Sequence, residues 1–134
     1  MAHSNGHVDL EAVRKGGVAT GWGACSNSKL ALVMFTYELA RRLQGTGVTA
    51  NCLHPGAVAT NIWRVPAALK RPFLKSAKEG AQTTVYLASS PEVEKVTGKY
   101  FENEKEKRFL DAPYGEKQAL ELWEETAKLV GLSD

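Results

Sequence analysis

The strongest constraint on the fold is a long amphipathic helix that is followed closely by a strand. Residues 24–43 carry apolar side chains at helical spacing, on a stripe wide enough to imply burial on two sides. The stripe consists of Leu32, Phe35, Leu39 and Leu43, widened by Leu30, Val33, Met34 and Tyr37. Gly45 and Gly47 end the helix, and the β-branched residues that begin at Val48 predict a strand over residues 48–53. Such a helix-to-strand connection is typical of a layered α/β fold with parallel strands.

The second half of the sequence continues this alternation. Ser76 and Glu79 have the spacing of a capping box, which predicts a helix over residues 77–89. Ala81, Val85 and Ala88 are expected to face inward from this helix. The remaining predictions are a short strand over residues 98–101, a charged turn over residues 102–108 and a final helix over residues 115–130. Two strands are fewer than a parallel sheet normally has, so we expect the end of an α/β domain, its sheet completed by other strands or by another subunit.

Size and charge limit the classes of protein that the chain can represent. Its 134 residues suffice for one domain over residues 1–134. The net charge of +2 gives no electrostatic reason to expect a nucleic-acid or anionic-membrane partner. No apolar run approaches the roughly 20 residues of a membrane span, and neither a secretory signal nor a lipidation motif is recognisable. We therefore expect a cytoplasmic protein without a membrane span.

The cysteines and histidines do not have the spacing of a metal site. Cys25 and Cys52 belong to no Cys-x-x-Cys pair, and we expect both to be reduced and buried. His3 and His7 lie near a glycine and an asparagine without further ligands nearby. No metal is therefore predicted.

Two motifs indicate a family. They are CSNSKLA at residues 25–31, at the start of the long helix, and LHPGAVAT at residues 53–60, after the first strand. Supporting similarities are FTYELARRL at residues 35–43, EGAQT at residues 79–83, GKYF at residues 98–101 and LW at residues 122–123. With these motifs the sequence resembles the short-chain dehydrogenase/reductase family, most closely its retinol-dehydrogenase-like branch, over nearly the whole chain.

The resemblance implies a fold, a cofactor and a reaction. The fold would be the C-terminal half of a Rossmann-like doubly wound parallel-sheet fold, with about two strands and three main helices in this chain. The N-terminal half, which binds the dinucleotide phosphates through a glycine-rich turn, has no match in this sequence. The cofactor would be NADP or NAD, and the reaction hydride transfer between that cofactor and an alcohol or carbonyl.

The resemblance also assigns site residues on the long helix. The family has a Tyr-x-x-x-Lys pair on one helix face, where the ammonium group lowers the pKa of the phenol and holds ribose hydroxyls. Lys29 takes the position of the lysine, and Cys25 stands at the position of the tyrosine. A cysteine sulfur reaches less far than a phenol oxygen, so we expect carbonyl reduction to be impaired or lost in this short chain.

Further cofactor-binding residues follow the first strand. By resemblance these residues shape a loop whose backbone meets the nicotinamide carboxamide, while its threonine approaches phosphate. The predicted cofactor-binding residues are Lys29, Pro55, Gly56, Val58 and Thr60. Because fixed phosphate-binding amides are missing from the sequence, we expect weak dinucleotide affinity. An apolar substrate is suggested by Trp63, Val65 and Phe73, which lie in the segment after this loop.

Two other functions compete with the oxidoreductase. The chain could be a non-catalytic oligomerisation or interaction module, for instance a homodimer formed through the helix over residues 24–43. It could also perform Cys-based hydrolase or thiol chemistry, with Cys25 near a helix start as nucleophile and His54 as base.

Overall fold

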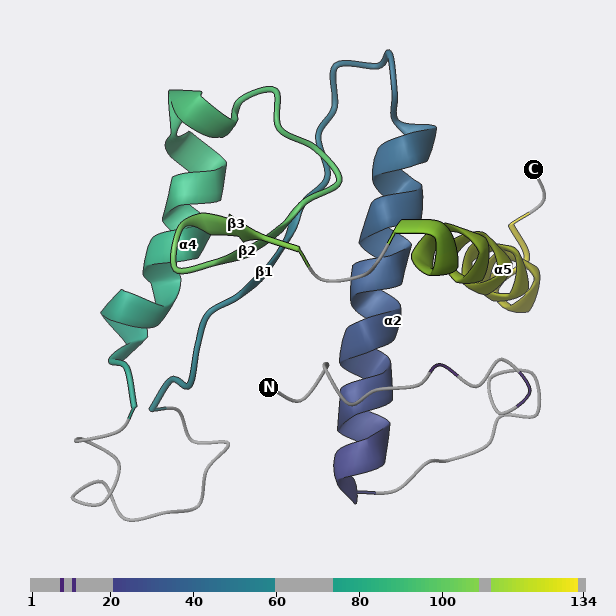
Figure 1. Ribbon diagram of the computed structural model, residues 1–134, viewed down its shortest axis with the longest axis horizontal. Helices are drawn as coiled ribbons and strands as arrows, with labels where there is room; N and C mark the ends of the chain where they lie inside the picture. Colours follow the sequence, from purple (N-terminus) through teal and green to yellow (C-terminus); the bar gives the residue numbers. More distant parts are fainter. Residues whose placement is uncertain (1–7, 9–10, 12–20, 60–73, 109–111, 133–134) are drawn as a thin grey trace.

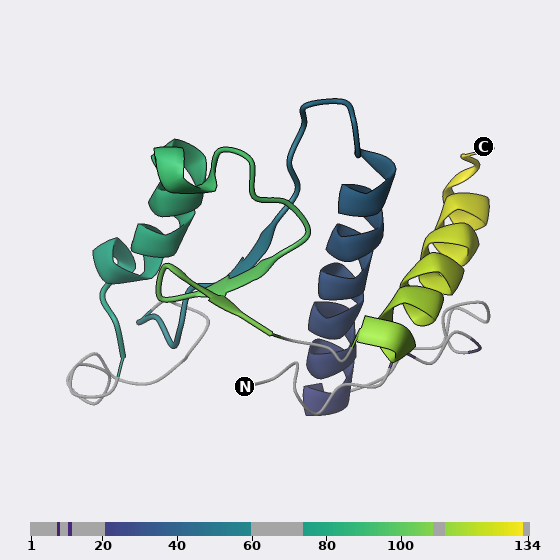
Figure 2. The same cartoon turned by 45° about the horizontal axis from the view of Figure 1, so that its top comes forward.

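A computed structural model describes residues 8, 11, 21–59, 74–108 and 112–132. In chain order the elements are α2 (Gly21–Arg42), β1 (Cys52–His54), α4 (Ala77–Ser89), the 3-10 turn η2 (Pro91–Val93), β2 (Tyr100–Glu102), β3 (Lys105–Lys107) and α5 (Ala112–Val130). Helices α4 and α2 lie on opposite sides of a small sheet, and α5 packs against α2 (Figures 1 and 2). The predicted α/β architecture with three main helices is therefore confirmed.

The sheet has three strands in the order β1-β2-β3. Strands β1 and β2 are parallel, with Cys52 opposite Tyr100, and β2 and β3 are antiparallel. Strand β1 is shorter than the predicted strand over residues 48–53, because regular pairing begins only at Cys52. Upstream of β1, the Gly98 N–H still donates to the Ala50 carbonyl oxygen at 2.8 Å. The Asn51 side chain adds two bonds: its Nδ2 donates to the Val96 carbonyl oxygen at 2.7 Å, and its Oδ1 accepts from the Lys99 N–H at 3.1 Å.

The prediction of a charged turn over residues 102–108 is wrong, since this segment ends β2 and forms β3. Asn103 and Glu104 both have left-handed backbone conformations, with φ of 53° and 60°. Two such residues in a row make the tight turn whose twist suits a β-hairpin. Strand β3 is exposed along its whole length, so its sequence lacks the apolar alternation that predicts a strand.

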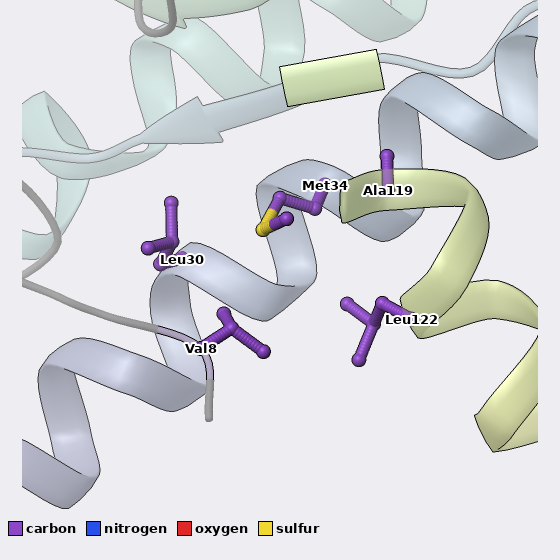
Figure 3. Close-up of a cluster of buried hydrophobic side chains, with 5 residues drawn as sticks. All are labelled: Val8, Leu30, Met34, Ala119 and Leu122. Atoms are coloured by element: carbon purple, nitrogen blue, oxygen red, sulfur yellow. The ribbon is translucent and has the colours of Figure 1, made fainter. Parts of the chain in front are cut away.

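A buried apolar cluster joins α2 to α5 (Figure 3). It consists of Val8, Leu30, Met34, Ala119 and Leu122. Beside this cluster, the Phe35 and Trp123 rings stack with centroids 5.1 Å apart, and the Arg42 guanidinium lies 4.6 Å from the Trp123 ring. The buried side of α2 therefore includes Leu30 and Met34, whereas Leu32 of the predicted stripe is 54% exposed.

Helix α4 has the predicted bounds and the predicted cap. The Glu79 carboxylate accepts from the Ser76 N–H at 2.7 Å, and the Ser76 hydroxyl accepts from the Glu79 N–H at 3.2 Å. The predicted inward face is wrong, because Ala81, Val85 and Ala88 are exposed and the buried residues are Gly80 and Thr83. The Thr83 hydroxyl accepts from the Glu104 N–H at 3.2 Å, so the face of α4 that meets the sheet is set by a small and a polar residue.

The side chain of Glu38, near the C-terminal end of α2, is a buried carboxylate. The Glu38 side chain is only 3% exposed, and it accepts hydrogen bonds of 2.7 and 2.8 Å from Arg41 and one of 2.8 Å from Arg42. The bonds from Arg41 are the main cause that lowers the pKa of Glu38 below its ordinary value, and those from Arg42 add to it. The ionised form of Glu38 therefore stabilises the folded chain.

We expect the stabilisation by ionised Glu38 to be lost at low pH. Because the folded-state pKa lies below the ordinary value of 4.5, the contribution is present above that pH and is lost as pH falls through the folded-state pKa. Glu38→Gln should lower the free energy of unfolding by about 2–3 kcal/mol at pH 7 and by much less at pH 3, measured by urea denaturation. Glu121→Gln, which removes an exposed carboxylate 3.8 Å from Lys117, is the control and should change little at either pH. An equal loss for Glu38→Gln at both pH values would contradict this account.

Candidate functional site

The candidate site lies at the end of the fold where α2 begins and β1 ends. Helix α2 and strand β1 run in opposite directions, so the first turns of the helix and the carboxyl end of the strand are on the same side (Figure 1). Ligands of open α/β sheets bind beyond the carboxyl ends of the strands. The residues that the sequence singles out, on α2 and after β1, lie at this end.

Cys25 and Lys29 are four residues apart on α2 and therefore on one face of the helix. Both side chains are exposed, so the expectation of a buried Cys25 is wrong. The Ser28 hydroxyl donates to the Cys25 backbone carbonyl oxygen at 2.9 Å, and the Cys25 thiol is free and exposed. Within residues 21–59, 74–108 and 112–132, no hydrogen bond or ion pair involves the Lys29 ammonium group. The lysine can therefore contact a ligand without breaking an ion pair in this part of the chain.

The loop after β1 is held by the segment that precedes α4. The Ala59 N–H donates to the Lys75 carbonyl oxygen at 2.9 Å, and the Lys75 N–H donates to the Ala57 carbonyl oxygen at 2.8 Å. These two bonds form an isolated parallel bridge that centres on Val58. Gly56 has a φ of +87°, a conformation that favours glycine and turns the chain sharply away from β1. Thr60 lies outside the described residues, so the structure tests only the first part of the predicted cofactor loop.

Lys75 belongs to this site, although sequence reasoning did not find it. A Cβ added to Gly56 would lie 3.1 Å from Lys75 Cδ and Cε, so the lysine stem passes directly over the glycine. The Lys75 ammonium group donates to the Asn103 side-chain oxygen in the β2–β3 turn. Lys75 thus links the loop, the start of α4 and the hairpin, a relation between distant segments that no sequence spacing indicates.

Three titratable groups near the sheet, the buried Tyr100 and the half-buried Cys52 and Tyr37, are not poised for proton transfer. Burial is the main cause that raises the pKa of Cys52 to about 11 and the pKa values of Tyr37 and Tyr100 to about 12. All three groups stay protonated at neutral pH. Tyr37 lines a cleft of about 460 Å³ between α2 and α5, together with Arg41 and Leu120.

The alternative thiol chemistry, with Cys25 as nucleophile and His54 as base, stays a prediction. Helix α2 begins at Gly21, so Cys25 lies beyond the first turn, where the helix dipole acts most strongly. No group of three His, Cys, Asp or Glu side chains able to hold a metal occurs in the described part of the chain. Likewise, none of the described helices has the length and hydropathy to cross a membrane.

Comparisons with known proteins show which family this chain resembles. Residues 14–68 match the family described as short chain dehydrogenase. Over 117 residues the chain is 50% identical to retinol dehydrogenase 14 of Homo sapiens, an alignment that covers 80% of this chain and 35% of the relative. These matches show that the chain is similar to the short-chain dehydrogenase/reductase family over most of its length. Its similarity is to the retinol-dehydrogenase-like branch, which confirms the resemblance seen in the motifs.

Other relatives extend the match. Retinol dehydrogenase 13 of Mus musculus is 40% identical over 153 residues, covering 99% of this chain and 44% of the relative. Polyprenol dehydrogenase of Homo sapiens is 35% identical over 142 residues, covering 98% of this chain and 43% of the relative. The chain thus spans less than half the length of these curated relatives. A crystal structure of an uncharacterised protein from Mycobacterium paratuberculosis superposes with a TM-score of 0.65 at 28% identity, covering 96% of this chain and 47% of the other.

The two thiols should differ strongly in reactivity. Cys25 is exposed, whereas Cys52 is half-buried and its pKa is raised to about 11. Because the thiolate is the reactive form, iodoacetamide at pH 8 should modify Cys25 at least about tenfold faster than Cys52. Mass spectrometry of Cys52→Ser and Cys25→Ser, which each keep one thiol, measures the two rates separately. Equal rates in the folded variants would show that Cys52 is not protected as described.

Proposed function

We propose that this chain provides the nicotinamide-side part of a dinucleotide site in an NAD- or NADP-dependent oxidoreductase of alcohols and carbonyls. The observation that supports this proposal is that α2, which carries Lys29, begins on the same side of the fold as the carboxyl end of β1, which leads into the loop over residues 55–59 (Figure 1). These are the features that the family resemblance relates to the cofactor. The named activities of the retinol and polyprenol dehydrogenases point to the same reaction class.

The chemistry of these residues fits the nicotinamide ribose. Lys29 is an exposed ammonium group with three donors, which can hold ribose hydroxyls. The loop adds backbone groups near Gly56, where the absence of a side chain lets the chain turn tightly after β1. When bound, the dinucleotide would supply or accept the hydride.

Proton transfer is the step that this chain supports poorly. Cys25 stands where the family has its tyrosine, and its sulfur lies closer to the helix backbone than a phenol oxygen would. Tyr37 does not replace the missing phenol, because it lies eight residues after Lys29 and its pKa is raised to about 12. We therefore propose that hydride transfer is impaired in the chain as it stands.

The substrate we propose is an apolar alcohol or its carbonyl counterpart. Two of the relatives are named for retinol and polyprenol, both of which are apolar alcohols. Trp63, Val65 and Phe73, which suggested an apolar substrate from the sequence, lie outside the described residues, so the support comes from the relatives.

Calorimetric titration of the chain with NADPH and with NADH tests this proposal. We expect a dissociation constant of about millimolar order, because the assigned contacts address only the nicotinamide end of the dinucleotide. Lys29→Ala should weaken binding by about fivefold or more, since it removes a charged donor. The matched control is Lys117→Ala, which removes an 82% exposed lysine from α5 and should leave binding unchanged.

Two results would contradict the proposal. The first is an absence of binding heat for both dinucleotides at several millimolar. The second is an equal effect of Lys29→Ala and Lys117→Ala, which would mean that any binding reflects general charge attraction rather than a site at α2.

A further inference from the structure

We propose that Gly80 is a positioning residue for the loop over residues 55–59. The absence of a side chain at Gly80 lets Val58 pack against the backbone of α4, and this Val58–Gly80 contact determines where the loop backbone lies. The effect on the cofactor rests on the function proposed above, whereas the effect on the loop does not.

The contact is too close for any side chain at position 80. A Cβ added to Gly80 would lie 2.5 Å from Val58 Cγ2, 3.1 Å from Cγ1 and 3.4 Å from Cβ. Gly80 is buried in the interior of α4 and has no left-handed backbone conformation that would explain a glycine. Glycine also weakens a helix interior relative to alanine. The packing of Val58 is therefore the physical reason for a glycine at this position.

The Val58 side chain cannot move aside easily. Valine is branched at Cβ, so both methyl groups are fixed by a single χ1 angle. Two hydrogen bonds to Lys75 hold the backbone on either side of Val58. The Ala59 N–H donates to the Lys75 carbonyl oxygen at 2.9 Å, and the Lys75 N–H donates to the Ala57 carbonyl oxygen at 2.8 Å. An added Cβ would therefore displace the loop or the helix as a whole.

Helix α4 is the better anchored of the two. Its N-terminus is fixed by the capping box of Ser76 and Glu79, and its Thr83 hydroxyl binds the Glu104 N–H in the β2–β3 turn. One turn further on, the Tyr86 ring lies against Phe101 of β2, with centroids 6.4 Å apart. The loop, in contrast, has the bridge at Val58 as its one backbone pairing with other described residues. We therefore expect a side chain at position 80 to displace the loop rather than α4.

The displacement is large enough to matter for a ligand. To restore an ordinary contact of 3.4 Å, Val58 Cγ2 must retreat by roughly 0.9 Å from a Cβ at position 80. Misplacement of a binding group by about 1 Å is enough to reduce catalysis or binding strongly. Gly80 thus acts on the cofactor loop through Val58, without touching a ligand itself.

Amide hydrogen exchange, followed by NMR, tests the effect on the loop directly. In Gly80→Ala we expect the Ala59 and Lys75 amides to lose protection by about tenfold or more, because their mutual bridge is strained. The Cys52 amide, which binds the Lys99 carbonyl oxygen at 3.0 Å, should keep its protection and so reports that the sheet remains intact. Unchanged protection of Ala59 and Lys75 in folded Gly80→Ala would overturn the proposal.

A second variant keeps the test decisive if Gly80→Ala does not fold. Val58→Ala removes both methyl groups that the new Cβ would meet, so Gly80→Ala combined with Val58→Ala should fold and regain protection at Ala59 relative to Gly80→Ala alone. Failure of the double variant to regain either folding or protection would show that Gly80 acts in another way.

Titration of the same variants with NADPH separates this proposal from the proposed function. If the unmodified chain binds NADPH, Gly80→Ala should weaken binding by about fivefold or more and the double variant should restore part of the loss. A loss that the double variant does not restore would count against the Val58–Gly80 contact. If the unmodified chain does not bind, the proposed function fails, and the exchange measurement still decides the role of Gly80.

Discussion

The parallel pairing of β1 with β2 is the constraint on which the arrangement of the site depends. Parallel strands cannot be joined by a hairpin, so the chain between them must cross over, and α4 forms part of that connection. Each strand has only three residues, and the side chain of Asn51 extends the pairing through its bonds to Val96 and Lys99. With this pairing in place, the loop after β1, the start of α4 and the β2–β3 turn come together at one end of the sheet.

The other half of the structure is organised by α2 and α5. Met34 is 1% exposed in the cluster between these helices, and the Phe35–Trp123 stack and the Arg42 guanidinium add to the same contact. The predicted homodimer through residues 24–43 would use a face of α2 on which Phe35 already contacts α5, while Leu32 is exposed. That dimer stays a prediction, and any partner would have to accommodate α5 beside α2.

Local signals in the sequence predicted the main helices and the first strand. Contacts between distant segments determined the inward face of α4, the pairing of β3 and the place of Lys75. The capping box of Ser76 and Glu79 involves residues three apart, so both the bounds and the cap of α4 could be predicted. The inward face of α4 could not, because it depends on Val58 and on the turn at Glu104. Strand β3 was missed for a similar reason, since its three exposed residues become a strand only by pairing with β2. Motif resemblance placed Lys29 and Gly56 at the site, but Lys75 became visible only through its contacts with the loop and Asn103.

The central claim is that Lys29 and the loop after β1 belong to one ligand-binding surface. Backbone amide chemical shifts of the ¹⁵N-labelled chain during addition of NADPH test it most directly, because each amide reports on its own surroundings. The account predicts that shifts concentrate at Lys29 and residues 56–59 and leave the amides of the α2–α5 cleft, such as Glu116 and Leu120, unchanged. Shifts at Glu116 and Leu120 with none at residues 56–59 would place the ligand in that cleft and contradict the account.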